Sequence, residues 1–240
     1  MSDTVTLVLV PGSLCNQQLF APQIEFLNSR VNIQVADFSD CDTIAAMAAK
    51  VLGQVEGEFA LLGLSMGGII SFEIMRKAPH RVTHLALLNT NPRAEIAERL
   101  SIRQQQIDEV TAGGTAALLK ITEELLFPNY LAPGCGDCEQ IKAVILAMAE
   151  EVGPTQFIHQ WRALSTRIDS RPRLSEIGCP TLLLTGEHDG ICSPERYREM
   201  AAAIPHSRLQ IVADCGHIST LEQPHIINRA IADWLALSRQ

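Results

Sequence analysis

Short, almost wholly apolar runs alternate along the chain with longer segments in which apolar residues recur every three to four positions. Uninterrupted apolar runs are typical of strands covered on both faces, and the longer period is typical of amphipathic helices. The alternation therefore predicts an α/β fold with a mostly parallel central sheet and helices on both faces. The expected strands are Thr4–Val10, Val31–Ala36, Phe59–Leu64, Val82–Asn89, Thr181–Thr185 and Leu209–Val212.

Three segments between or after these strands predict helices that cover the sheet. Ile44–Leu52 and Gly68–Lys77 have helical periodicity, and Pro79 closes the second of them. A last helix is expected over Pro224–Leu237, where apolar positions return at helical spacing and the proline stands in the first turn.

The strand–helix alternation stops between residues 92 and 179, where the pattern predicts helices only. Glycine and proline pairs separate these helices from one another. We expect residues 1–91 and 180–240 to form the core and residues 92–179 to form a helical cap, inserted over one edge of the sheet. The expected cap helices are Ala94–Thr111, Thr115–Leu126, Asp137–Glu151 and Thr155–Ile168.

Composition and charge limit the kind of partner that the chain binds. The 240 residues fit one core domain with a modest insertion, and 47% hydrophobic with 19% charged residues is typical of a globular protein. A net charge of −8 argues against nucleic acid as the main partner, because binding phosphates needs a basic surface. No apolar run is long enough for a membrane helix, and Met1–Thr4 lacks the basic residues of a signal peptide. We therefore expect a cytoplasmic protein that does not bind membranes.

Seven cysteines, an odd number, favour buried thiols over a framework of disulfides. Cys135 and Cys138 have the spacing of half a zinc or redox site, but no second pair of cysteines or histidines accompanies them. No metal is therefore predicted. Cys15, Cys192 and Cys215 each lie near a candidate site motif; packing is the simplest role for them, and a thiol that lines the substrate pocket is the alternative.

The sharpest local signal is Gly63-Leu64-Ser65-Met66-Gly67, which stands between an expected strand and an expected helix. A serine at such a tight turn is held in a strained backbone conformation, and the flanking glycines let neighbouring chain pass closely. The turn also places Ser65 at the start of a helix, where free N–H groups favour developing negative charge. The motif predicts a nucleophile; the alternative is a glycine-rich turn that serves packing alone.

These features together resemble the capped α/β-hydrolase family over essentially the whole chain. The strands, the serine turn, the inserted helices and two later motifs follow the order of that family, which implies an acid and then a histidine after the serine. The segment from Gly186 to Pro194 resembles the family's Gly-x-x-Asp-x₄-Pro pattern. The resemblance assigns the acid to Asp189, and the neighbouring Glu187 is the alternative.

The histidine of the family pattern is assigned to His217. The segment from Gly216 to Pro224 resembles the family's Gly-His-x₄-Glu-x-Pro signature, and the other histidines lack this context. His188 is a weaker alternative because it adjoins the expected acid. We expect Glu222 to hold the loop in place rather than to transfer protons, and Asp214 is too close to His217 in sequence to be its first-choice partner.

The three residue types fit nucleophilic catalysis. A serine hydroxyl needs a base to take its proton, neutral imidazole suits that task, and a carboxylate behind the ring fixes its tautomer. The oxyanion that forms needs fixed donors, which we expect to be the backbone N–H groups of Met66 and Ser13, with Leu14 next. The family often has His-Gly at the second donor, where this chain has Pro11-Gly12. We therefore expect Gly12 to form the tight turn and Ser13 to be the preferred donor.

The resemblance implies a serine hydrolase that cleaves a carboxylic ester, thioester or lactone of a small to medium substrate through an acyl-Ser65 intermediate. It implies no metal, nucleotide or flavin cofactor. The alternatives are a hydrolase of carbon–carbon bonds or a lyase with the same three residues, or a receptor that turns its small ligand over slowly. The cap shows no distinctive charged cluster, which favours an apolar acyl or alcohol group, and the sequence leaves the oligomeric state open.

Overall fold

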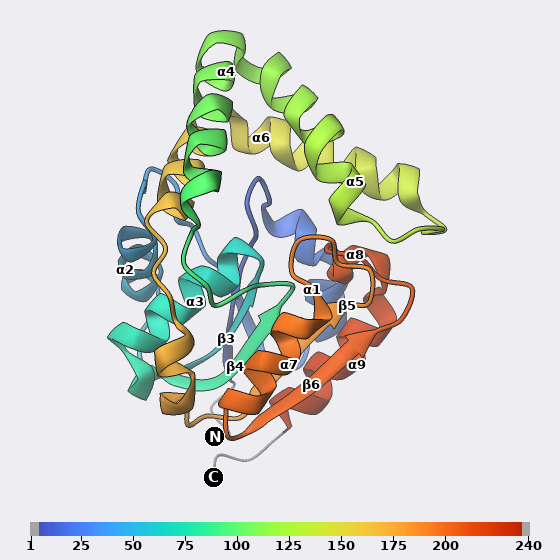
Figure 1. Cartoon of the computed structure of the whole chain (residues 1–240). Helices are drawn as coiled ribbons and strands as arrows, with labels where there is room; N and C mark the ends of the chain where they lie inside the picture. The colour runs from blue at the N-terminus through green and yellow to red at the C-terminus, as the bar shows by residue number, and fades with distance from the viewer. Residues whose placement is uncertain (1–4, 237–240) are drawn as a thin grey trace.

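A six-stranded parallel sheet forms the centre of the structure, a computed structural model that describes residues 5–236 (Figure 1). The strand order is β2-β1-β3-β4-β5-β6, and each neighbouring pair in the sheet is parallel. This confirms the predicted sheet, although the expected start of the first strand at Thr4 lies outside the described residues. The strands are β1 (Thr6–Val10), β2 (Asn32–Val35), β3 (Phe59–Leu64), β4 (Val82–Leu88), β5 (Thr181–Gly186) and β6 (Ser207–Val212).

The apolar residues of the central strands divide between two buried layers, one on each face of the sheet. Successive side chains of a strand point to opposite faces, so a continuously apolar strand supplies both layers. Leu61 of β3 and Leu87 of β4 are fully buried in one layer, whereas Leu62 and Leu88 are fully buried in the other. The outer strands β2 and β6 are only partly buried, because each has a neighbour on one side only.

Helices cover both faces of the sheet, as predicted. On one face α2, α3 and α7 contribute buried residues such as Met47, Ile70 and Tyr197 to the same apolar layer as Leu61. On the other face α1 and α9 pack against each other and against the sheet through residues such as Trp234. The core helices are α1 (Ala21–Leu27), α2 (Ile44–Gln54), α3 (Met66–Lys77), α7 (Pro194–Ala203), α8 (Ser219–Glu222) and α9 (Pro224–Leu235), with short 3₁₀ turns η1 (Gln17–Phe20), η2 (Pro79–Arg81) and η4 (Arg171–Glu176).

The predicted last helix extended to Leu237, which lies outside the described residues. Helices α1, α7 and α8 were not predicted. They are short, and the buried positions of α7 are only Tyr197 and Met200.

Helices inserted between β4 and β5 form a separate layer above the sheet, green to yellow in Figure 1. This confirms the expected helical insertion, whose exact boundaries at residues 92 and 179 stay a prediction. Two expected breaks are kinks within longer helices, at Gly114 with φ of 58° and at Gly153 with φ of 79°. The cap consists of α4 (Ala97–Ile121), the π-helical turn η3 (Thr122–Leu126), α5 (Phe127–Tyr130) and α6 (Cys138–Ser165).

Two glycines flank the turn between β3 and α3 because backbone passes there at contact distance. A Cβ atom at Gly63 would overlap the carbonyl oxygen of Gly67, and one at Gly67 would overlap the carbonyl oxygen of Val10. Backbone atoms of a central strand cannot move aside as the end of a flexible side chain can. Gly63 must therefore lack a side chain for β3 and α3 to meet closely at this turn, and Gly67 must lack one for α3 to pack against β1.

Replacing Gly67 with alanine tests this constraint. We expect Gly67→Ala to lower the free energy of unfolding by about 1–3 kcal/mol or more, because the methyl group overlaps backbone of β1. Denaturant titration followed by circular dichroism measures the change. The matched control is Gly53→Ala in α2, where no atom lies within 4 Å of the added Cβ. That variant should gain up to about 1 kcal/mol from helix propensity, and equal effects of both substitutions would contradict the close-approach argument.

Candidate active site

Ser65 occupies the turn between β3 and α3 with an unusual backbone conformation. Its φ of 56° and ψ of −116° lie in a region that residues with a side chain rarely adopt. Two hydrogen bonds hold the strained residue: its N–H donates to the carbonyl of Leu88 at 2.9 Å, and its carbonyl accepts from the Thr90 hydroxyl at 2.7 Å. Ser65 directly precedes the first turn of α3, so free N–H groups of that helix lie beside it.

His217 lies in the loop after β6 and faces Ser65. Its Nε2 atom is 2.9 Å from the Ser65 Oγ atom. The ring stacks on Tyr130 of the cap with 5.1 Å between ring centroids, and the His217 N–H donates to the Tyr130 carbonyl at 2.6 Å. The cap therefore fixes both the backbone and the ring plane of this histidine.

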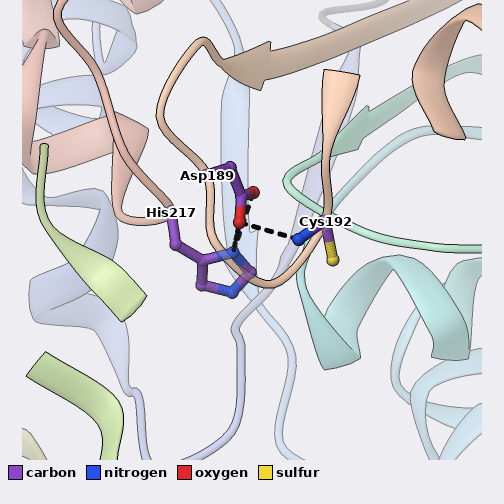
Figure 2. A group of neighbouring side chains, drawn as sticks. All are labelled: Asp189, Cys192 and His217. Atoms are coloured by element: carbon purple, nitrogen blue, oxygen red, sulfur yellow. Dashed lines mark hydrogen bonds and ion pairs between the residues drawn. The ribbon is translucent and has the colours of Figure 1, made fainter. Parts of the chain in front are cut away.

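Asp189 lies in the turn after β5, behind the His217 ring (Figure 2). Both carboxylate oxygens are 2.9 Å from His217 Nδ1. Because a carboxylate only accepts hydrogen bonds, Nδ1 carries the proton and Nε2 is left to accept from the Ser65 hydroxyl. Burial disfavours the charged form of Asp189, but His217, Asn89 and the Cys192 N–H outweigh burial and lower its pKa below the ordinary value.

The structure separates the expected residues from their alternatives. Asp189 is buried, whereas Glu187 and His188 are exposed on the solvent side of the same turn. Asp214 is also exposed. The residue that contacts His217 is thus Asp189, and none of the recorded contacts of Ser65 involves these three alternatives.

Glu222 anchors the histidine loop through three backbone N–H groups. Its Oε2 atom accepts from Gly216 at 3.0 Å and from Ala132 of the cap at 2.9 Å, and its Oε1 atom accepts from Ile218 at 3.1 Å. Burial raises the pKa of Glu222 although these N–H groups favour the carboxylate. Its contacts match the expected structural role, and they also tie the loop to the cap.

Asn89, at the end of β4, is a site residue that the sequence did not reveal. Its Nδ2 atom donates to Asp189 Oδ2 at 3.0 Å and to the Gly216 carbonyl at 3.1 Å, and its Oδ1 atom accepts from the Ser219 hydroxyl at 2.6 Å. One buried amide thus holds the acid turn and the histidine loop together. The available signal was a polar residue that directly follows the apolar run at residues 85–88 of β4, at the end of a parallel sheet where ligands bind.

The two expected oxyanion donors lie beside the serine. Ser13 and Met66 line the same cavity as Ser65, and the backbone N–H groups of both make no hydrogen bond to another described residue. The alternative donor, the Leu14 N–H, is already committed: it donates to Oε1 of Gln160 on cap helix α6 at 2.8 Å. The cap therefore holds the loop that carries Ser13.

A cavity of about 390 Å³ lies over Ser65, between the core and the cap. Apolar side chains, among them Ile69, Leu164 and Trp161, form much of its wall. The expectation of a cap without a charged cluster is wrong, because three cap arginines line the cavity as well. They are Arg99, Arg103 and Arg167. Two of them stand one helical turn apart on α4, which was a signal in the sequence, but the third follows α6 and joins them only in the folded chain.

Asp189, Cys192 and His217 are close enough together for their donor atoms to share a metal ion (Figure 2). The hydrogen bonds that these residues make fit an Asp189–His217 pair better than a metal site. Asp189 Oδ1 also accepts from the Ile191 and Cys192 N–H groups at 2.8 Å each, and both ring nitrogens of His217 already have partners. Burial raises the pKa of the Cys192 thiol well above its ordinary value, which disfavours the thiolate that binds metals.

Burial also keeps the thiols of the other two cysteines near the site motifs, Cys15 and Cys215, protonated. Burial raises the pKa of Cys15 to about 12, and Cys215 is fully buried. Of the three, only Cys192 is among the cavity-lining residues, and its side chain is almost inaccessible to solvent. The structure thus assigns Cys15 and Cys215 to packing.

Known proteins resemble this chain over most of its length. A family model described as the alpha/beta hydrolase fold matches residues 36–224. The chain is 28% identical to a pimeloyl-[acyl-carrier protein] methyl ester esterase of Aliivibrio salmonicida, with 88% of this chain and 84% of that protein covered. It is 26% identical to a putative carbamate hydrolase RutD of Klebsiella pneumoniae, with 81% and 73% covered. The solved structure of a thermophilic esterase from Thermogutta terrifontis superposes with a TM-score of 0.87 at 27% identity, with 96% of this chain and 89% of that chain covered.

Removing the Asn89 amide should raise the pKa of Asp189, because Asn89 is one of the groups that lower it. A lowered pKa contributes stability that is present above the ordinary aspartate value of about 3.9 and is lost as pH falls through the folded value. In Asn89→Gly this loss should be smaller in total and complete at higher pH, because the folded pKa of Asp189 lies closer to the ordinary value. Urea unfolding measured between about pH 3 and pH 6 tests the shift.

Glycine is the preferred substitution because Asn89 has φ of 47°, which alanine would adopt only with strain. Asn89→Ala therefore separates the backbone cost from the loss of the amide. Asn28→Ala, at an exposed position, is the control and should leave the pH dependence unchanged. An Asn89→Gly profile that overlies the wild-type profile would show that the amide does not act on Asp189.

Proposed function

The chain belongs to the alpha/beta hydrolase family as an ester-acting hydrolase, and from this premise we propose that it cleaves a carboxylic ester, thioester or lactone through an acyl-Ser65 intermediate. One observation carries the proposal: a continuous hydrogen-bonded chain from Ser65 Oγ through His217 to Asp189, with each contact at 2.9 Å. Such a chain is what a weak hydroxyl nucleophile needs in order to lose its proton as it attacks.

In the proposed first stage His217 Nε2 takes the Ser65 proton while Oγ attacks the substrate carbonyl. The carboxylate of Asp189 keeps the proton on Nδ1 and stabilises the imidazolium that forms. His217 then donates the proton from Nε2 to the leaving alcohol or thiol, and the acyl group stays on Ser65. In the second stage His217 Nε2 takes a proton from water, whose oxygen attacks the acyl carbon. Nε2 then returns that proton to Ser65 Oγ as the bond between Oγ and the acyl carbon breaks and the acid leaves.

The negative charge of the tetrahedral intermediate needs donors that are already in place. We assign this role to the backbone N–H groups of Ser13 and Met66, which lie beside Ser65 and are not used elsewhere among the described residues. Met66 is the first residue of α3, so the positive end of the helix dipole adds to the effect. The residues of this chain supply the base, the acid and the oxyanion donors, and water is the only other reactant, so the scheme requires no cofactor.

We propose that residues 92–179 act as the cap domain that encloses a small-molecule substrate over Ser65. The cavity of about 390 Å³ lies between this segment and the core, and residues of both line it. Within residues 5–236, no helix combines the length and apolar character that crossing a membrane requires. A cytoplasmic location stays a prediction.

Covalent labelling tests the nucleophile. A fluorophosphonate probe should modify Ser65, and Ser65→Ala should abolish both the label and steady hydrolysis of a chromogenic acyl ester. Mass mapping of the labelled peptide identifies the residue. Turnover that survives Ser65→Ala would contradict the acyl-Ser65 scheme. A single stoichiometric burst in the wild type, with no turnover afterwards, would instead favour the slow receptor over the hydrolase.

The contact between the cap and the Ser13 loop gives a second test of the scheme. Gln160→Ala removes the acceptor of the Leu14 N–H, so we expect the loop to lose its alignment and kcat to fall about tenfold, less than the 10²–10³ typical for losing an oxyanion donor itself. KM should change less than kcat, because the donors act mainly on the transition state.

A matched control exists one helical turn away. Gln156 on α6 accepts the Asp40 N–H at 3.0 Å, so it also joins the cap to the core, but it is not among the cavity-lining residues. Gln156→Ala should keep the wild-type kcat. Equal losses in both variants would mean that the glutamines only hold the cap in place.

A further inference from the structure

Three arginines converge on the cavity wall from two segments of the cap. Arg99 and Arg103 lie on α4, and Arg167 follows the end of α6. Glu95, just before α4, binds two of them: Oε2 accepts from Arg103 Nε at 2.6 Å and Oε1 accepts from Arg167 at 3.0 Å. The Arg103 guanidinium also lies over the Trp161 ring, 5.6 Å from its centroid.

The positive charge of this cluster is not balanced by the protein. No aspartate or glutamate is among the residues that line the cavity, and Glu95, with a side chain only 2% exposed, is the one carboxylate paired with the three arginines in the described structure. Two positive charges therefore remain on the cavity side, in a protein whose net charge is −8. A local excess of this kind attracts an anion.

Arg167 supplies an independent sign of a missing partner. Its side chain is only 9% exposed, and its buried Nε atom makes no hydrogen bond within the described residues. Burial lowers the pKa of Arg167, and the charges of Arg103 and Arg99 act in the same direction against the favourable charge of Glu95. A buried guanidinium donor without an acceptor is costly, and an oxyanion would remove that cost.

We propose that the cavity binds an ester whose acyl or alcohol part carries a second, oxyanionic group, a carboxylate or a phosphate, held by Arg99, Arg103 and Arg167. The inference rests on the proposed function and names the substrate class of that same site. Planar guanidinium groups bind such oxyanions through paired hydrogen bonds, and the aromatic and aliphatic walls would cover the apolar chain between the anion and the scissile bond.

The cluster is more than a structural ion pair. The ion pairs of Glu95 with Arg103 and Arg167 are sufficient to join α4 to the segment after α6, and they do not involve Arg99. Arg99 has no recorded hydrogen bond or ion pair in the described structure, yet it lines the same cavity over Ser65. Arg99 is exposed at the cavity, so solvent screens its repulsion from the other two arginines and its guanidinium remains available to a ligand.

Selectivity between a charged and a neutral ester tests the proposal. Monomethyl adipate carries a free carboxylate, and dimethyl adipate has the same chain without the charge. We expect wild-type kcat/KM to favour the monoester by about tenfold or more, the range of a charged hydrogen bond. Arg99→Gln and Arg103→Gln should each reduce that ratio by about tenfold, mainly through KM for the monoester.

Arg162→Gln is the matched control. It removes one positive charge from an exposed position on α6 that does not line the cavity, so the ratio should stay at the wild-type value. A wild-type enzyme that hydrolyses the diester as well as the monoester would overturn the proposal. So would a monoester preference that both Arg99→Gln and Arg103→Gln retain.

Binding to an inactive variant separates this inference from the proposed function. Adipate should raise the thermal unfolding midpoint of Ser65→Ala, and the shift should be lost in the double variant with Arg103→Gln. A larger shift with inorganic phosphate than with adipate would support the oxyanion site and identify phosphate as its preferred form. No shift with either ion would overturn the inference even if neutral esters are cleaved. Failure to cleave any ester, with adipate still bound, would reject the proposed function and keep the oxyanion site.

Discussion

The hydrogen bond between His217 and Asp189 is the contact on which the arrangement of the site depends. His217 and Asp189 lie on loops after the neighbouring parallel strands β6 and β5, and both strands end at the same edge of the sheet. The Asn89 amide, at the end of the next strand β4, completes the set by holding both loops. Because the carboxyl ends of parallel strands point in one direction, residues far apart in sequence meet without a long excursion of the chain.

The sequence was most informative where the physical constraint is local. Strand β3 has the predicted bounds because every position from Phe59 to Leu64 is buried, and the Ser65 turn was recognised because glycine is the only residue that fits at Gly63 and Gly67. Elements whose position depends on contacts between distant segments could not be predicted from the sequence. Helix α7 buries few apolar residues, so its periodicity is weak.

The site residues follow the same division. Asp189 and His217 stand in motifs and were assigned, whereas Asn89 has no motif and acts only through the loops that the fold brings to it. The charged cavity wall was missed for a related reason. Arg99 on α4 and Arg167 just after α6 are distant in sequence, and each alone resembles an ordinary surface residue until the helices are packed.

The contact of Tyr130 and Ala132 with the histidine loop has a consequence for evolution and engineering. Tyr130, the last residue of α5, supplies the carbonyl bound by the His217 N–H, and Ala132, just after α5, supplies the N–H bound by Glu222. A helical insertion transplanted from another protein would have to bring this short segment with it, or His217, the proposed base, would be misaligned. Substitutions in α4 are therefore easier to accommodate than substitutions at the junction of α5 and α6, where the contacts with the histidine loop lie.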